Sequence, residues 1–223
     1  MKQTFQHALA ACALLTCVGA QAQVADHLMV RIGVVQVKPV VQSGDLSAPA
    51  FTGSQVDVTS STVLGGGITY MLDDHWAVDM PLATPLKHDI VGSGSVAGVG
   101  KLGETRALPI TLLGQYRFGG THDTFRPYLG AGLTYALFYK ERGTNTLNAL
   151  SGGTPTSPTT LSIDNRFGPS VQLGATMALN ERWFLDATVI KTWVKTTARL
   201  SRGQSLDLRL DPVAVAVGIG YRY

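Results

Sequence analysis

Cysteine, charge and long apolar runs are all scarce in this sequence. The two cysteines, Cys12 and Cys17, both lie near the N-terminus. The rest of the chain therefore has no thiol for a disulfide framework or a cysteine metal site. Charged residues make up 15% of the chain, against about 25% in soluble domains. Hydrophobic residues reach 45%, yet after the N-terminal segment no apolar stretch approaches the ~20 residues of a transmembrane helix. The apolar residues are scattered, which favours strands over membrane helices.

The N-terminal segment has the features of an export signal. Lys2 precedes an apolar run over residues 8–15, and Ala20 and Ala22 give the small-residue spacing that a signal peptidase accepts. We predict a cleaved signal peptide at residues 1–22 and a single domain at residues 23–223. The alternative is a lipoprotein signal ending at Cys17, although threonine before that cysteine fits it poorly. A net charge of +3, or +2 without Lys2, gives no indication of nucleic acid as a partner.

Apolar residues recur with a period of two. Near the C-terminus Val213, Val215, Val217 and Ile219 share one face, and small residues such as Gly218 occupy the other. This is the pattern of strands with one apolar face, and a helix would repeat at 3.6 residues. Eight such runs are present, at about 28–38, 62–72, 76–87, 107–118, 125–139, 166–179, 183–198 and 207–223.

The connections between these runs alternate between short and long. Short turns are expected at 73–75, 119–124 and 180–182, and long loops at 39–61, 88–106 and 140–165, with a shorter one at 199–206. The strand ends carry aromatic residues, namely Trp76, Tyr116, Phe118, Phe125, Trp183, Tyr221 and Tyr223. These features are typical of outer-membrane barrels with periplasmic turns and extracellular loops. We predict an all-β fold, an eight-stranded antiparallel transmembrane β-barrel in the outer membrane of a Gram-negative bacterium. The alternative is a soluble β-sandwich or lipocalin-like barrel, but its second face would be rich in charge.

Several segments resemble the OmpW family of small outer-membrane proteins, in the order in which that family carries them. They are Arg31-Ile32-Gly33, Val37-Lys38-Pro39, Ala83-Thr84-Pro85-Leu86-Lys87-His88, Leu108-Pro109-Ile110-Thr111, Gln115-Tyr116-Arg117-Phe118-Gly119, Phe125-Arg126-Pro127-Tyr128-Leu129-Gly130-Ala131-Gly132, Arg209-Leu210-Asp211-Pro212 and Gly220-Tyr221-Arg222-Tyr223. The resemblance implies an eight-stranded barrel that passes small hydrophobic molecules passively, through a narrow apolar tunnel that opens sideways between strands. It also implies bulky apolar residues near a constriction, which fall at Pro81 and Ile190. Ile190 keeps that character, whereas Pro81 departs from it and removes a ladder donor from its strand.

Alternation also places charged residues in the lumen near the periplasmic end. Isolated charges in a crowded lumen are costly, so pairing is expected. We predict an ionic plug formed by Arg31, Asp79, Arg126 and Asp186, with Gln115, Arg117 and Arg222 nearby at strand ends. Above the plug, the lumen lining is expected to include Val35, Val37, Met71, Leu113, Phe138, Pro81 and Ile190, with Tyr128 and Thr134 orienting a polar end of a solute.

Other chemistry finds little support. Glycine runs such as 65–67 are not followed by the lysine of a phosphate loop, and the histidines lack metal-ligand spacing. We therefore expect no cofactor, no metal site and no enzymatic activity. The expected partners are membrane lipid, lipopolysaccharide, small hydrophobic solutes, and the barrel-assembly machinery through the C-terminal strand that ends in Tyr223. A second function, as a structural protein or a receptor acting through the extracellular loops, stays open.

Overall fold

The computed structural model describes residues 27–48, 52–154 and 156–223. The expected signal peptide at residues 1–22 lies outside the described residues. No helix in these ranges is long and apolar enough to cross a membrane.

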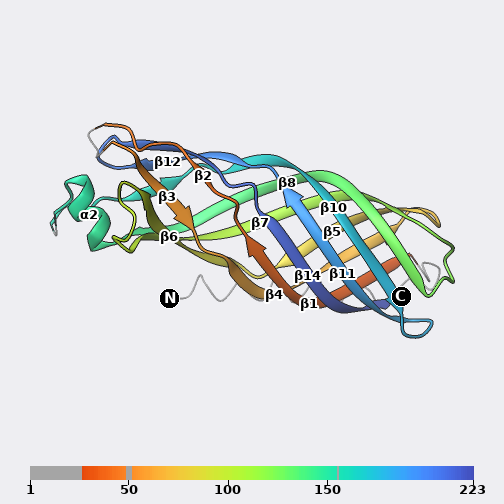
Figure 1. Cartoon of the computed structure of the whole chain (residues 1–223). Coiled ribbons are helices and arrows are strands. Elements are labelled where there is room, and N and C mark those ends of the chain that lie inside the picture. Colours follow the sequence, from red (N-terminus) through yellow and green to blue (C-terminus); the bar gives the residue numbers. More distant parts are fainter. Residues whose placement is uncertain (1–26, 49–51, 155) are drawn as a thin grey trace, which may run out of the picture.

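The fold is a closed antiparallel barrel of eight strands, as the sequence predicts. Its strands are β1 (Leu28–Lys38), β4 (Ser61–Met71), β5 (Trp76–Ala83), β7 (Lys101–Arg117), β8 (Phe125–Gly143), β10 (Arg166–Ala178), β11 (Trp183–Thr192) and β14 (Val213–Arg222). The barrel closes where β1 pairs with β14, from Met29 opposite Arg222 to Lys38 opposite Val213. Figure 1 shows the strands tilted steeply around one long axis, with the C-terminus at the end that carries the tight turns.

Residues of the apolar face point outward. Ile32, Leu64, Leu133 and Val217 are 58–64% exposed, although soluble proteins bury side chains of this kind. Their neighbours on the opposite face are buried, for example Thr69 in β4. An apolar exterior around a more polar interior is the arrangement that lipid requires of a barrel.

Aromatic side chains form a girdle at the turn end. Tyr116 contacts Trp76 and Phe118, with ring centroids 5.1 and 5.0 Å apart, and Tyr221 contacts Trp183 and Tyr223 at 5.1 and 4.8 Å. Farther along the barrel, toward its extracellular end, Tyr135 of β8 packs on Phe167 of β10, with ring centroids 4.6 Å apart. Amphipathic rings favour the membrane–water interface, so the two levels mark the edges of the apolar band.

The short turns are set by side-chain caps. The carboxylate of Asp73 accepts hydrogen bonds from the backbone N–H groups of His75 and Trp76 at 2.8 and 2.7 Å. These bonds lower the pKa of Asp73, which is exposed outside the membrane-spanning strands. Asn180 binds the N–H groups of Arg182 and Trp183 in the same way, at 2.9 and 2.8 Å. An Asx turn of this kind favours a tight hairpin turn between two neighbouring strands.

The extracellular connections are longer than the periplasmic turns, as predicted, but much of their length forms strands and one helix, an extension of the barrel wall. The extension contains β2 (Gln42–Ser43), β3 (Ser54–Val58), β6 (Leu86–Gly94), α2 (Asn145–Ser151), β9 (Leu161–Ile163), β12 (Lys195–Leu200) and β13 (Ser205–Arg209). Strand β3 pairs with β6 and β6 with β7, while β2, β13, β12 and β9 form a separate four-stranded sheet in that order.

Three of the eight predicted runs are interrupted in the structure. The run 76–87 divides into β5 and β6 at Pro85, and the run 207–223 divides into β13 and β14 at Pro212. Proline lacks the N–H that a ladder needs. Asp211, before Pro212, also has a positive φ of 32°. The run 183–198 divides into β11 and β12. This interruption lies beside the one at Pro212, because the N–H of Thr192 donates to the carbonyl oxygen of Pro212 at 3.1 Å.

Candidate functional site

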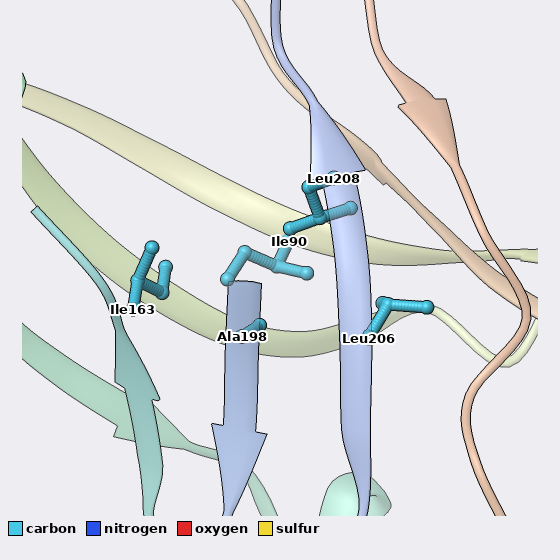
Figure 2. Close-up of a cluster of buried hydrophobic side chains, with 5 residues drawn as sticks. All are labelled: Ile90, Ile163, Ala198, Leu206 and Leu208. Atoms are coloured by element: carbon cyan, nitrogen blue, oxygen red, sulfur yellow. The ribbon is translucent and has the colours of Figure 1, made fainter. Parts of the chain in front are cut away.

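An apolar cavity occupies the extracellular half of the barrel. Its volume is about 220 Å³. The upper walls carry a cluster of buried aliphatic side chains on strands of the extension: Ile90 of β6, Ile163 of β9, Ala198 of β12, and Leu206 and Leu208 of β13 (Figure 2). Because an eight-stranded barrel holds side chains or one small ligand, a space of this kind suits a small apolar molecule.

A row of four hydroxyl groups runs along one side of the lumen, and three of them line the cavity. Thr111, Thr134, Ser170 and Thr192 come from β7, β8, β10 and β11, and each oxygen lies 2.6–2.8 Å from the next. Thr134 lines the cavity, as expected. The hydroxyls satisfy one another in a lumen that is otherwise apolar at this level, which lowers the cost of burying them.

Below the hydroxyls, Arg31 binds two carboxylates. Its guanidinium donates to both oxygens of Asp79 at 2.8 and 2.9 Å, and its Nε lies 3.4 Å from Oδ1 of Asp186. Thr69 adds a bond to Asp79 at 2.6 Å. Arg31, Asp79 and Asp186 are each at most 9% exposed. Paired, bidentate contacts are what buried charges need.

Amide, hydroxyl and guanidinium groups extend this network across the lumen. Gln172 donates to Asp79 at 3.1 Å and accepts from Gln115 at 2.7 Å. Arg117 donates to Gln115 and to Thr176, at 3.1 and 2.8 Å. We call the set Arg31, Thr69, Asp79, Gln115, Arg117, Tyr128, Gln172, Thr176 and Asp186 the polar layer. It spans the barrel from β1 and β4 to β10 and β11.

Arg126, predicted as the fourth plug residue, lies outside this layer. Its guanidinium donates to the carbonyl oxygens of Asp74, Phe118 and Gly119 at 2.5, 3.4 and 3.3 Å. Those carbonyls belong to the periplasmic turns, so Arg126 stands closer to the barrel end than Arg31. Arg117, which was predicted to lie near the plug, belongs to the polar layer, and its guanidinium lies 4.7 Å from the ring centroid of Tyr128.

The predicted lining residues divide between two levels. Val35, Pro81, Phe138 and Ile190 line the cavity, as does Val37. Leu113 and Tyr128 do not: both are fully buried at the level of the polar layer, where Leu113 is the register partner of Asp79. Tyr128 donates its hydroxyl to Asp186 at 2.9 Å, so this hydroxyl is already engaged.

Beneath the polar layer lies a second apolar cluster. Met29, Met71, Ala77 and Phe184 pack together near the turns. The sequence indicated that Met71 lines the upper lumen, and this prediction is wrong, because Met71 belongs to the lower cluster. The cluster and the polar layer together fill the periplasmic half of the barrel, below the cavity.

The wall beside the cavity contains a seam without ladder pairing. Strand β5 pairs with β7 up to Asp79 opposite Leu113, and pairing resumes only where β6 begins, at Leu86 opposite Ala107. Between these points, residues 80–85 and 108–112 are not in register with each other, although β5 still pairs with β4 and β7 with β8. We call this segment the β5–β7 seam.

A proline stands on each side of the β5–β7 seam, Pro81 and Pro109, and both line the cavity. Neither has an N–H to donate. Leu82, the next residue of β5, is also part of the cavity wall and is 45% exposed. The apolar cavity therefore lies directly behind the seam.

Groups suited to a metal ion are not gathered here. Across the described residues, no cluster of three or more His, Cys, Asp and Glu side chains is placed to hold one. The charged side chains of the polar layer are directed toward each other.

Comparison with known proteins places this geometry in a family. The profile of the OmpW family matches residues 25–223. Outer membrane protein W of Vibrio cholerae is 35% identical over 229 residues, which cover 100% of both chains. The crystal structure of OprG from Pseudomonas aeruginosa superposes with a TM-score of 0.79 at 30% identity, covering 89% of this chain and 96% of that one. A protein of Pseudomonas aeruginosa named dibenzothiophene metabolism operon protein PahQ is 24% identical over 181 residues, 80% of this chain and 79% of the relative.

Proposed function

The chain belongs to the OmpW family of outer-membrane proteins, and we propose that it is a channel through which small hydrophobic molecules cross the lipopolysaccharide layer passively. In this proposal a solute enters the apolar cavity from the extracellular end and leaves sideways into the bilayer, through the β5–β7 seam. No energy source is needed, because the solute moves from water into progressively more apolar surroundings.

The observation that supports this most is that the cavity ends at the polar layer and meets the seam. Arg31 and Asp186 form part of its floor, whereas Pro81, Ala83, Ala107 and Pro109 form the side. Transfer of apolar surface from water into such a cavity is favourable by about 25 cal/mol per Å². Passing the charged floor would require breaking buried ion pairs, so the side exit has the lower barrier.

The name of the PahQ relative suggests a substrate class. Dibenzothiophene is a flat, uncharged, apolar molecule, and that protein is named for the operon of its metabolism. We extend the class, small uncharged hydrophobic compounds, to this chain.

Uptake by cells tests the proposal. A deletion strain and the same strain with the gene restored would be given radiolabelled n-octane at equal cell density, and the initial uptake rates compared. The proposal expects a faster rate in the restored strain. The control for barrel insertion alone is Ala198→Trp, which places a large side chain in the cavity. At an equal amount of inserted barrel, its uptake rate should match that of the deletion strain. Equal rates in the deletion and restored strains would contradict the proposal.

A receptor or structural role through the extracellular face is the second candidate. The ordered extension favours it, because α2 is capped by Thr144, whose hydroxyl accepts the N–H of Leu147 at 3.4 Å, and ends at Gly152 with φ of 78°. Leu147, Leu150 and Ser151 of α2 line the cavity, so the test leaves them in place: replacing residues 152–158 with a Gly-Ser linker would abolish recognition by a partner but leave n-octane uptake unchanged. Loss of uptake with intact barrel insertion would instead tie the extension to transport.

A further inference from the structure

Two polar side chains lie side by side in the upper wall of the cavity. His88 of β6 and Thr105 of β7 are register partners, both line the cavity, and they are 5% and 4% exposed. The residues beside them point to the outer face: Lys87 forms an ion pair with Glu104 at 3.0 Å, and Arg106 is exposed. A charged outer face places this rung of the barrel above the apolar band, in the extracellular extension.

The hydrogen bonding of His88 fixes its tautomer. Its Nδ1 lies 2.6 Å from the carbonyl oxygen of Thr59. A carbonyl oxygen only accepts, so Nδ1 carries the hydrogen. Burial lowers the pKa of His88, so at pH 7 the ring is neutral. The other nitrogen, Nε2, then holds a lone pair and acts as an acceptor.

The hydroxyl of Thr105 has no hydrogen-bond partner in the part of the chain that the structure describes. Its Oγ1 is a buried atom without a hydrogen bond among the described residues. Buried hydroxyls are nearly always satisfied, so an orphan that lines a cavity indicates a missing partner. By contrast, Thr111 and Thr134 of the hydroxyl row, which also line the cavity, satisfy each other.

We propose that His88 and Thr105 form a polar subsite that binds the hydroxyl group of an otherwise apolar solute. The hydroxyl of the solute donates to Nε2 of His88 and accepts from Oγ1 of Thr105, while its hydrocarbon part lies against Ile90 and the aliphatic cluster. The inference rests on the proposed function, and it names a preferred substrate class, small aliphatic or aromatic alcohols. A ketone would satisfy Thr105 alone, because its oxygen cannot donate to a lone pair. An alkane would satisfy neither group.

Nuclear magnetic resonance of the full barrel in lipid nanodiscs tests the subsite directly. The protein would carry ¹⁵N-histidine and ¹³C-labelled Ile and Leu methyl groups, and would be titrated with 1-octanol or with n-octane. Both probes are expected to shift the methyl resonances of Ile90 and Leu208, since both enter the cavity. Only 1-octanol is expected to move the Nε2 resonance of His88 upfield, as an acceptor nitrogen does when it gains a hydrogen bond.

Three variants separate recognition from folding. Thr105→Val keeps the shape but removes the hydroxyl, and it is expected to weaken 1-octanol binding by about three- to tenfold, the loss of one neutral hydrogen bond, with less than a twofold change for n-octane. Thr105→Ser is expected to restore 1-octanol binding. His88→Asn keeps a donor for the carbonyl of Thr59 but is too short to place an acceptor at the position of Nε2, so it should also weaken 1-octanol binding alone. The control is Thr62→Val, an exposed threonine of β4.

The outcomes distinguish the subsite from the channel. Methyl shifts with both probes, but an unmoved Nε2 resonance and equal loss of both ligands in Thr105→Val, would overturn the subsite and leave the channel standing. Absence of methyl shifts with either probe would overturn the channel, and the subsite with it.

Discussion

The hydroxyl of Tyr128 reaches Oδ2 of Asp186 at 2.9 Å, and this bond joins β8 to β11 across the intervening strand β10. The crossing is possible because the residue of β10 opposite Tyr128 is Gly174. A Cβ at that position would lie 2.3 Å from the tyrosine ring. The polar layer therefore depends on a glycine that leaves room for the ring of Tyr128.

Gly174→Ala should destabilise the barrel. The added methyl group would displace Tyr128 and leave Asp186 with one hydrogen bond fewer, a loss of about 1–3 kcal/mol in unfolding free energy. The measurement is urea-induced unfolding in lipid vesicles, followed by tryptophan fluorescence. Gly114→Ala is the matched control, because a Cβ at Gly114 would lie 3.9 Å from its nearest neighbour, the carbonyl oxygen of Ala131. Equal stability of the two variants would show that Tyr128 is not held as described.

Removing the carboxylates of the polar layer should let ions through. In Asp79→Asn with Asp186→Asn, the guanidinium of Arg31 loses both charged partners, and water is expected to follow an unpaired buried charge. Single-channel conductance in planar bilayers should rise above that of the unmodified protein. The control is Asp164→Asn, whose carboxylate pairs with Arg166 and Arg199 at the exposed rim. Unchanged conductance in the double variant, with normal heat-modifiable mobility on gels, would exclude a sealing role.

Acid should loosen the outer face of the extension only at low pH. Lys101 and Lys87 lower the pKa of Glu104 to about 2. A lowered carboxyl pKa adds stability that is fully present above the ordinary value near 4.5 and is lost as the pH falls through about 2. The carboxyl ¹³C resonance of Glu104 should therefore titrate well below pH 4. In Lys101→Gln the midpoint should move upward, toward the ordinary value. A midpoint near 4.5 in the unmodified protein would contradict these ion pairs.

The sequence predicts which face a residue takes, but not its height along the barrel. Arg31, Asp79 and Asp186 lie on the inward face that the period of two indicates, because successive side chains of a strand point to opposite faces. Height depends on how far each strand is staggered against the next, which no local pattern encodes. For this reason Arg126 and Met71 stand nearer the periplasmic end than expected, and Tyr128 belongs to the polar layer and not to the cavity lining.

The extracellular extension was missed for a different reason. Its strands are short, β3 and β13 having five residues each, and prolines 85 and 212 interrupt the pattern that would link β6 and β13 to the barrel. In β13 the inward residues Leu206 and Leu208 follow the period of two. Two apolar positions between Ser- and Gly-rich segments are, however, too few to indicate a strand. The orphan hydroxyl of Thr105 has no sequence signal, because it arises only where β6 and β7 meet.

The central claim is that solutes leave the cavity through the β5–β7 seam, and one uptake measurement tests it most directly. Ala107 lines the cavity beside the seam, whereas Ala131 is exposed on the lipid face. Uptake of radiolabelled n-octane would be compared in cells that carry the unmodified protein, Ala107→Trp or Ala131→Trp, at equal amounts of folded barrel. The account predicts that Ala107→Trp falls to the rate of the deletion strain and that Ala131→Trp keeps the unmodified rate. An Ala107→Trp strain that takes up n-octane at the unmodified rate would contradict exit through the seam.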